Sequence, residues 1–264
     1  MNEIAIVTGG SSGIGRETAL ALKGRGCRVY EFSRHDASVP GVEHLNCDVS
    51  DEQQFRAAVQ TVIEREGRVD ILVNNAGFGI SGAAEFTDNA QAKKLLDVNL
   101  FGMVNGCRAV IDQMRKQGRG RIVNLSSVAA PCAIPFQVWY SVSKAAVSTY
   151  TAALANELRP FGITLTAVMP GDIRTGFTAA RKKSTEGDDI YGGRISASVA
   201  KMEKDEQNGM RPEDAARTIV RVALKKGRVK PYYAIGLSYK FLVLLDSLLP
   251  CRAVRWLLYQ LYGK

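Results

Sequence analysis

Short apolar runs alternate with longer segments of helical periodicity along most of this chain of 264 residues. The apolar runs are rich in β-branched residues and span 3–8, 28–33, 43–47, 71–74, 121–126, 164–169 and 232–235. The helical segments between them span 14–25, 51–66, 88–116, 138–159 and 212–226. This alternation is typical of repeated βαβ units, which build a parallel sheet with helices on both faces.

The pattern predicts an α/β fold with one Rossmann-like, doubly wound domain and about seven parallel strands. We assign residues 1–236 to this domain and residues 237–264 to a C-terminal helical extension of it. The segment at about 176–210 interrupts the alternation of strands and helices, because it is polar and has no clear strand. It follows the carboxyl end of a strand, where doubly wound sheets bind ligands. We therefore interpret it as a substrate lid rather than a solvated insertion.

Composition excludes several classes of protein. The N-terminus has no basic segment or cleavage site, and no run of about 18 uncharged apolar residues indicates a membrane span. Five scattered cysteines favour reduced thiols in a cytoplasmic protein, and two histidines are too few for the common metal sites, so no metal is expected. The net charge of +9 comes from residues 215–264, where ten basic residues accompany one acid. Since this segment is also apolar and aromatic, no nucleic-acid partner is expected.

A glycine-rich turn follows the first predicted strand and opens a helix. It reads Thr8-Gly9-Gly10-Ser11-Ser12-Gly13-Ile14-Gly15, with the spacing GxxxGxG. Glycines allow a tight turn and bring backbone N–H groups close to a phosphate at the positive end of the helix. Its position between a strand and a helix predicts a dinucleotide site rather than plain turn chemistry.

The end of the second strand bears on the choice between the two nicotinamide cofactors. An acid at that position accepts the ribose 2′-hydroxyl of NAD(H), whereas the 2′-phosphate of NADP(H) calls for a guanidinium. The strand ends in Ser33 followed by Arg34, which favours NADP(H) unless the arginine is merely solvated. Glu31 is the residue that favours NAD(H), but it lies two positions earlier and we expect it not to reach the cofactor.

Tyr140 and Lys144 lie four residues apart on one face of a predicted helix. A tyrosine with its ordinary pKa near 10 is a poor acid or base at neutral pH. A fixed positive charge beside it favours the phenolate and moves the pKa toward the working range. The four-residue spacing alone also fits a tyrosine and a lysine on the protein surface, so the surrounding motifs decide between a catalytic and a structural pair.

These motifs make the sequence, over about residues 3–235, resemble the classical short-chain dehydrogenase/reductase family. They occur in the family's order: 8–15, Cys47-Asp48-Val49, Asn74-Asn75-Ala76-Gly77, Val98-Asn99, Asn124-Leu125-Ser126-Ser127, 140–144 and Pro170-Gly171-Asp172-Ile173-Arg174-Thr175. The resemblance implies an enzyme that interconverts an alcohol and a ketone by hydride transfer with a nicotinamide cofactor.

The resemblance also implies roles for single residues. Ser127 would hydrogen-bond the substrate carbonyl, while Ser126 would point to the opposite face of the strand. Tyr140 would donate or accept the proton, and Lys144 would lower the pKa of the tyrosine and hold the nicotinamide ribose. Asn99 would hold a water that links Lys144 to solvent. The other implied cofactor contacts are Asp48 and Val49 at the adenine, Asn75, Ala76 and Gly77 at the ribose, Pro170 and Gly171 in a turn, and Ile173 and Thr175 at the carboxamide.

An apolar, basic tail follows the last predicted strand, and Pro250 divides it into two short helices. In the second, Arg252, Arg255 and Tyr259 form a polar stripe beside a Trp/Leu face. The tail resembles those of the hydroxysteroid and retinol dehydrogenase-like branches, whose substrates partition into lipid. It could contact an anionic membrane surface, pack over its own substrate cleft or form a dimer interface.

The leading hypothesis is therefore NADP(H)-dependent interconversion of a secondary alcohol and a ketone on a lipophilic, steroid-like molecule. A 3-oxoacyl-[acyl-carrier-protein] reductase shares the catalytic motifs, but the apolar tail argues against it. A non-catalytic NADP(H)-binding regulator is disfavoured by the complete catalytic set. The helices at 88–116 and 138–159 resemble those that form dimers and tetramers in this family, so we expect a homo-oligomer. The expected location is cytoplasmic, with peripheral membrane association as an option.

Overall fold

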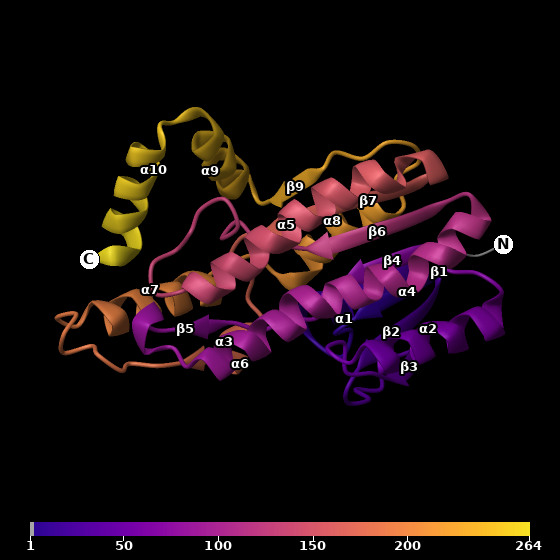
Figure 1. Ribbon diagram of the computed structural model, residues 1–264, viewed down its shortest axis with the longest axis horizontal. Helices are drawn as coiled ribbons and strands as arrows, with labels where there is room; N and C mark the ends of the chain where they lie inside the picture. Colours follow the sequence, from indigo (N-terminus) through magenta and orange to yellow (C-terminus); the bar gives the residue numbers. More distant parts are fainter. Residues whose placement is uncertain (1–2) are drawn as a thin grey trace.

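The computed structural model describes residues 3–264, in which a parallel sheet lies between two layers of helices (Figure 1). The sheet has seven strands in the order β3-β2-β1-β4-β6-β7-β9, and each neighbouring pair is parallel. The strands are β1 (Ile4–Thr8), β2 (Arg28–Ser33), β3 (Glu43–Asn46), β4 (Ile71–Asn74), β6 (Gly120–Leu125), β7 (Ile163–Pro170) and β9 (Tyr232–Ile235). The predicted doubly wound fold is confirmed, and each strand lies close to its predicted bounds.

Helices cover both faces of this sheet. The main ones are α1 (Gly13–Gly24), α2 (Glu52–Glu66), α3 (Asn89–Leu96), α4 (Gly102–Gln117), α5 (Val138–Leu158) and α8 (Pro212–Ala223). Short 3-10 turns occur at η1 (Ala84–Phe86) and η3 (Arg159–Phe161).

Side-chain alternation along β1 divides the core between the two faces of the sheet. Ile4 and Ile6 pack into one cluster with residues of α2, α4 and α5. Ala5 and Val7 pack into a second cluster with residues of α1 and α8. Successive side chains of a strand point to opposite faces, so a strand covered on both sides must be apolar at every position. β1 and β4 are accordingly buried throughout.

The long helix predicted at 88–116 has a local irregularity. α3 passes into a π-helical turn, η2 (Asp97–Phe101), before α4 begins. A π-turn adds a residue to one turn of helix and is frequent at functional sites. The predicted helical segment is confirmed, and the π-turn within it was not foreseen, because hydrophobic periodicity does not reveal one extra residue.

The segment predicted as an irregular lid contains regular structure. It includes α6 (Phe177–Ala180), α7 (Arg194–Gln207) and a two-residue strand, β8 (Lys182–Lys183), which pairs with β5 (Ile80–Ser81). α7 buries Ile195, Ser198, Val199 and Met202, which recur at helical spacing. The expectation of no strand was wrong because two exposed lysines carry no strand signal.

The tail folds into the two predicted helices, α9 (Leu237–Leu248) and α10 (Cys251–Leu258), with Pro250 at the N-cap of α10. It ends in a π-helical turn, η4 (Tyr259–Gly263), which packs on α7. Figure 1 shows α9 and α10 in yellow, at the end of the molecule where α7 lies. Within residues 3–264, no helix combines the length and apolar character needed to cross a bilayer.

Candidate active site

A cavity of about 620 Å³ extends along the carboxyl ends of the strands, from the glycine-rich turn after β1 to Glu206 at the end of α7. It opens where the strand order reverses between β1 and β4, the position at which doubly wound sheets bind ligands. The predicted site residues that line it are Gly9, Ser11, Ser12, Gly13, Ile14, Ser33, Arg34, Asp48, Val49, Asn75, Ala76, Gly77, Ser127, Tyr140, Lys144, Pro170, Gly171, Ile173 and Thr175. Two others, Gly15 and Asn99, lie behind the cavity wall.

The glycine-rich turn forms a cradle that suits a pyrophosphate. Gly9 and Gly13 have φ angles of 64° and 54°, in the region that favours glycine. A Cβ on Gly15 would lie 2.2 Å from the carbonyl oxygen of Gly9, so Gly15 permits close packing rather than ligand contact. Ser12 and Ile14 line the cavity at the start of α1, where free N–H groups and the helix dipole attract an anion.

The loop after β4 is fixed to β1 at the centre of the cavity. The backbone N–H of Asn75 donates to Oγ1 of Thr8 at 2.9 Å, and its Nδ2 donates to the Thr8 carbonyl at 3.0 Å. The N–H of Ala76 also donates to Oγ1 of Thr8. On the other wall, Thr175 lies close to Gly13, because a Cβ on that glycine would be 3.4 Å from the Cβ of Thr175. The structure therefore brings the predicted phosphate and nicotinamide segments together.

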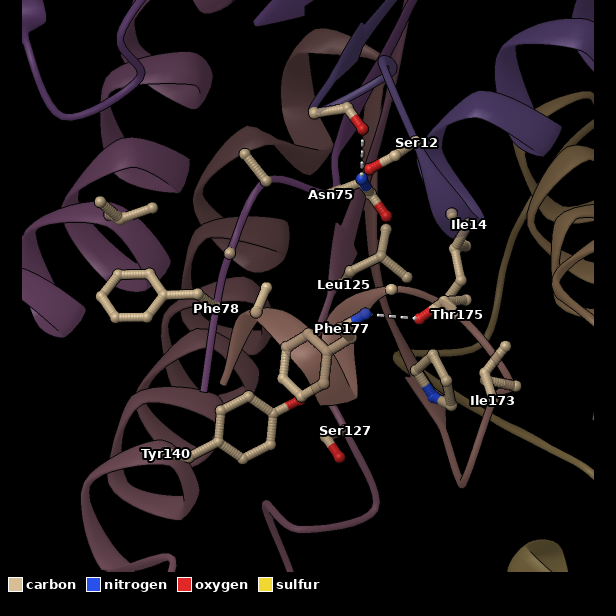
Figure 2. A pocket seen from close by; sticks show the side chains of 18 of the residues that line it. Ser12, Ile14, Asn75, Phe78, Leu125, Ser127, Tyr140, Ile173, Thr175 and Phe177 are labelled. Carbon is tan, nitrogen blue, oxygen red and sulfur yellow. Dashed lines mark hydrogen bonds between the residues drawn. The ribbon is translucent and has the colours of Figure 1, made fainter. Parts of the chain in front are cut away.

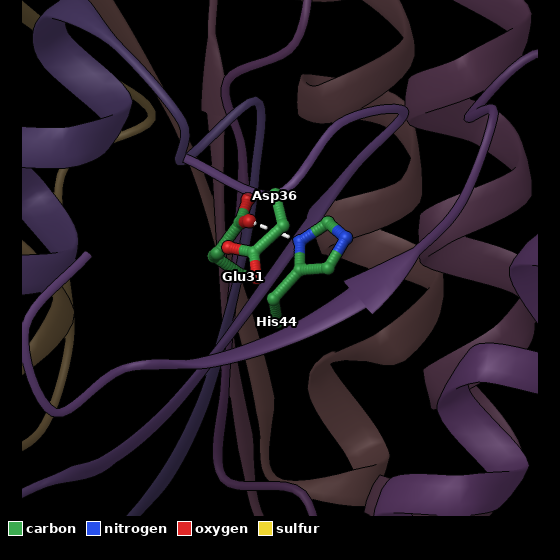
Figure 3. A group of neighbouring side chains, drawn as sticks. All are labelled: Glu31, Asp36 and His44. Atoms are coloured by element: carbon green, nitrogen blue, oxygen red, sulfur yellow. Dashed lines mark hydrogen bonds and ion pairs between the residues drawn. The ribbon is translucent and has the colours of Figure 1, made fainter. Parts of the chain in front are cut away.

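At the opposite end of the cavity, Arg34 lies exposed after β2 and Asp48 follows β3. Glu31 is 1% exposed, and its carboxylate forms an ion pair with the imidazole of His44 (Figure 3). The hydroxyl of Ser33 donates to the same carboxylate at 3.2 Å. Glu31 is thus held inside the fold, and Arg34 is the charged side chain that β2 presents to the cavity.

Asp36 joins Glu31 and His44 in a small cluster (Figure 3). Two carboxylate oxygens and one imidazole nitrogen lie within 4.8 Å of one another, which composition alone did not foretell. Asp36 is exposed, and its Oδ1 accepts a hydrogen bond from the N–H of Ser38 at 2.7 Å. The cluster is therefore an ion pair with a second carboxylate beside it.

α5 places Tyr140 and Lys144 in the middle of the cavity. Lys144 is 5% exposed, and its ammonium donates to the carbonyl of Leu125 at 2.8 Å and lies 5.6 Å from the centre of the Tyr140 ring. Figure 2 shows Ser127 at the same end of the cavity, with the Phe177 ring beside that of Tyr140. The two ring centroids are 5.6 Å apart. Ser126 points the other way and donates to the carbonyl of Lys144 at 2.9 Å.

Asn99 lies in the π-turn η2 and is 2% exposed. Its Oδ1 accepts from the N–H of Phe78 at 2.9 Å, and its Nδ2 donates to the carbonyl of Phe78 at 2.9 Å and to Ser143 at 3.2 Å. A Cβ on Gly77 would be 3.0 Å from Oδ1 of Asn99 and 3.7 Å from the ammonium of Lys144. Asn99 therefore fixes the backbone next to Lys144, and its role in holding water stays a prediction.

Burial dominates the acid–base properties of the pair. Burial raises the pKa of Tyr140 to about 12, while a hydrogen bond with Ser127 acts in the opposite direction. The same desolvation lowers the pKa of Lys144 to about 8. The sequence predicted that the lysine would lower the pKa of the tyrosine, and this role of Lys144 stays a prediction, because burial is the largest influence on the pKa in the free protein. The phenol is consequently protonated at neutral pH.

Two carboxylates at the substrate end had no role assigned from sequence. Asp172 and Glu206 both line the cavity and both contribute to the raised pKa of Tyr140. Glu206 is paired with the buried guanidinium of Arg181, whereas Asp172 accepts a hydrogen bond from the neutral hydroxyl of Tyr239. Glu206 and Tyr239 lie far from the motifs along the chain, so no local pattern could have identified them.

Comparison with known proteins agrees with this geometry. Residues 3–186 match the family model described as short chain dehydrogenase. The chain is 40% identical over 227 residues to the 3-ketodihydrosphingosine reductase of Bacteroides thetaiotaomicron, which covers 85% of this chain and 84% of that protein. It is 30% identical over 253 residues to a probable short-chain type dehydrogenase/reductase of Helicobacter pylori, covering 94% and 93%. A crystal structure of a short-chain dehydrogenase from Streptomyces avermitilis has a TM-score of 0.84 at 30% identity and covers 94% of this chain and 93% of that one.

The order of the strands, the cavity at their carboxyl ends and these relatives lead to one assignment. The family's enzymes act on small molecules by hydride transfer to or from a nicotinamide cofactor. This chain therefore belongs to the short-chain dehydrogenase/reductase family and is an oxidoreductase of alcohol and ketone groups.

Proposed function

We propose that the enzyme is an NADP(H)-dependent reductase of a lipophilic ketone that carries an amino group next to the carbonyl. The observation that supports this substrate class is the pair of carboxylates, Asp172 and Glu206, in the same cavity as Tyr140 and Ser127. The reverse reaction would oxidise the corresponding secondary alcohol.

The proton in this reaction would come from Tyr140. Ser127 would donate a hydrogen bond to the substrate carbonyl oxygen, and the neutral phenol would transfer its proton to that oxygen. The cofactor, when bound, supplies the hydride. The raised pKa of Tyr140 keeps the phenol protonated at neutral pH, which suits reduction. Lys144 would hold the nicotinamide ribose, and its charge would assist the phenolate that forms.

NADP(H) is the proposed cofactor because of the charges at the end of β2. Arg34 is an exposed cation that lines the cavity next to the end of β2 and would pair with a 2′-phosphate. The acid that would favour NAD(H), Glu31, is buried and paired with His44. Because Glu31 is enclosed there, it would not be available to accept the ribose 2′-hydroxyl of NAD(H).

The carboxylates favour an amino ketone over a steroid. Glu206 is balanced by Arg181, but within residues 3–264 the Asp172 carboxylate has only the uncharged Tyr239 hydroxyl as its hydrogen-bond partner, so an ammonium group would be attracted to it. The name of the Bacteroides relative gives 3-ketodihydrosphingosine, a long-chain ketone with an amino group on the carbon beside the carbonyl. A steroid ketone or a 3-oxoacyl thioester has no such cation.

A spectrophotometric screen of NADPH oxidation tests this proposal. The substrates are 3-ketodihydrosphingosine, its N-acyl derivative, a ketosteroid and an acetoacetyl thioester. We expect the free amine to have the highest kcat/KM, and acylation, which removes the charge, to reduce it by roughly tenfold or more. Asp172→Asn should reduce the preference for the free amine over its N-acyl derivative without abolishing turnover of a neutral ketone. Faster turnover of the ketosteroid or the thioester would reject the amino ketone while leaving the reductase assignment intact.

We also propose that the lid segment at about 176–210 closes over the substrate, because Phe177 already lies against Tyr140.

A homodimer or homotetramer is proposed through the outer surfaces of η2 and α5, where Phe101, Val138 and Val142 are 53%, 41% and 44% exposed. Light scattering after size exclusion measures the mass of the oligomer directly.

The five cysteines are free thiols in the described chain, which is consistent with a reducing, cytoplasmic location.

A further inference from the structure

The helix α9 presents a continuous apolar stripe to solvent. Leu237, Phe241, Leu244 and Leu248 are 84%, 61%, 51% and 71% exposed. They recur at intervals of three or four residues, so they lie along one face of the helix. Isolated exposed apolar residues are ordinary, but a row of four on one helix indicates an interaction surface.

α10 and the first residue of η4 carry a second exposed face, made of aromatic and basic side chains. Trp256 and Tyr259 are 64% and 45% exposed, and Arg252 and Arg255 are exposed on the same side of the helix. Helical spacing places all four within one face, opposite the buried Val254 and Leu258. We call the exposed faces of α9 and α10 together the outer face of the tail.

The inner face of the tail is already occupied by the enzyme's own fold. Tyr239 packs against Gly171, where a Cβ would lie 2.2 Å from its ring, and donates a hydrogen bond to Asp172. Val254 and Leu258 pack on Cys132. The tail therefore packs behind Gly171 and Asp172, two residues that line the cavity, without lining the cavity itself.

Charge distinguishes the outer face from an ordinary protein interface. Lys240, Arg252 and Arg255 are exposed around the apolar stripe and the aromatic residues. The tail's one acid, Asp246, is half-buried on the other side of α9, where burial raises the pKa of its carboxyl. The outer face thus carries only positive charge.

We propose that the outer face of the tail docks on an anionic lipid bilayer, with α9 and α10 lying in the plane of its surface. Apolar residues would enter the boundary between headgroups and acyl chains, Trp256 and Tyr259 would lie at the headgroup level, and the basic side chains would contact lipid phosphates. α9 has twelve residues and is about 18 Å long, which suits a helix lying on a bilayer whose core is about 30 Å thick.

Docking in this orientation would bring the substrate end of the cavity near the membrane, because Tyr239 of α9 packs against Gly171 and Asp172, which line that end. A lipophilic ketone could then pass from the bilayer to Tyr140 with little exposure to water. This consequence rests on the proposed function, whereas the docking itself does not. A second copy of the chain is a poorer occupant, since a two-fold contact would bring the basic side chains of both copies together.

Flotation of the full-length enzyme with lipid vesicles tests the inference. Vesicles of phosphatidylcholine alone are compared with vesicles that also contain phosphatidylglycerol, at low and high salt. We expect binding to the anionic vesicles that weakens with salt. Leu244→Glu/Leu248→Glu should reduce binding by roughly tenfold or more, because two leucines that would enter the bilayer become charged. Arg252→Gln/Arg255→Gln should remove most of the preference for anionic lipid.

The controls separate docking from folding and from catalysis. Ile190→Glu makes the same exchange at a residue that is 71% exposed outside the tail, and it should bind vesicles normally. The two tail variants should turn over a water-soluble ketone at the wild-type rate, whereas Ile190→Glu lies in the proposed lid and serves as a control for vesicle binding alone. Tyr140→Phe should still bind vesicles, so a failed activity assay does not affect the result. Absence of wild-type binding, equal binding by the Leu244→Glu/Leu248→Glu variant, or dissociation of an oligomer by that variant would overturn the inference.

Discussion

Glu31 and His44 are register partners on the neighbouring strands β2 and β3, and Nδ1 of the imidazole contacts Oε1 of the buried carboxylate. The other carboxylate oxygen, Oε2, has no hydrogen-bond partner among residues 3–264. An uncompensated carboxylate at this depth is costly. His44 therefore keeps an acid paired at the place where a 2′-phosphate is proposed to bind.

His44→Leu should consequently weaken the preference for NADPH over NADH. Removal of the imidazole leaves Glu31 with the uncharged Ser33 hydroxyl as its remaining partner among residues 3–264, and we expect the ratio of the two kcat/KM values to fall by roughly tenfold. Glu31→Gln/His44→Leu removes the acid as well and should restore the ratio. Because the double variant also lacks the histidine, a ratio that stays low in it would show a packing effect instead.

Arg34→Gln should raise the KM for NADPH by roughly 10–100-fold, the value of a charge-assisted hydrogen bond. The KM for NADH should hardly change, because that cofactor has no 2′-phosphate. Arg25→Gln, which removes an exposed arginine at the end of α1, serves as the matched control. A wild-type enzyme that already prefers NADH would contradict the cofactor proposal.

Tyr140→Phe should lower kcat for ketone reduction by roughly 10²–10⁴-fold, since the proton donor is lost. NADPH binding, measured by fluorescence titration, should remain close to wild type. Tyr150→Phe removes a hydroxyl from the same helix, α5, and should leave kcat unchanged. Normal turnover by the Tyr140→Phe variant would exclude the phenol as the acid.

The buried ammonium of Lys144 should make the stability of the free enzyme depend on pH. Its pKa is lowered by burial from 10.5 to about 8, so between these values the unfolded chain binds more protons than the folded one. Stability then rises with pH across this window and is reduced below it, by at most about 3 kcal/mol. Lys144→Met should thus raise Tm at pH 7 by roughly 5 °C, and by less at pH 10, while abolishing turnover.

Lys226→Met is the control for that measurement, because Lys226 is exposed. It should give the same Tm as wild type at both values of pH. An equal gain in Tm from Lys144→Met at pH 7 and pH 10 would mean that packing, rather than the charge of the ammonium, causes the stabilisation.

Tyr239→Phe should loosen the tail, because Asp172 loses the hydroxyl that holds α9 to the end of β7. The lost hydrogen bond is worth about 1–2 kcal/mol, which corresponds to roughly 5–30-fold faster trypsin cleavage after Lys240, Arg252 or Arg255 if the tail must open first. Tyr259→Phe alters an exposed tyrosine of the same tail and should not change the cleavage rate. Equal cleavage rates for the two variants would show that the hydrogen bond does not hold the tail.

The strands and the cofactor end of the site were predictable because their signals are local. A strand such as β1, covered on both faces, must be apolar at each position, and the glycine-rich turn that follows it has few alternatives. The π-turn around Asn99 and the short strand β8 were not predictable. One extra residue in a helix and two exposed lysines leave no trace in hydrophobic periodicity.

Tyr140 illustrates which properties the sequence determines and which depend on the folded structure. The sequence by itself determined the family, the doubly wound sheet, the two tail helices and the four-residue spacing of Tyr140 and Lys144, because each depends on neighbours along the chain. Only the tertiary structure decided that burial raises the pKa of the phenol, that His44 pairs with Glu31, and that Asp172 and Glu206 lie in the substrate cavity. These depend on desolvation and on contacts between distant segments, which exist only once the chain has folded.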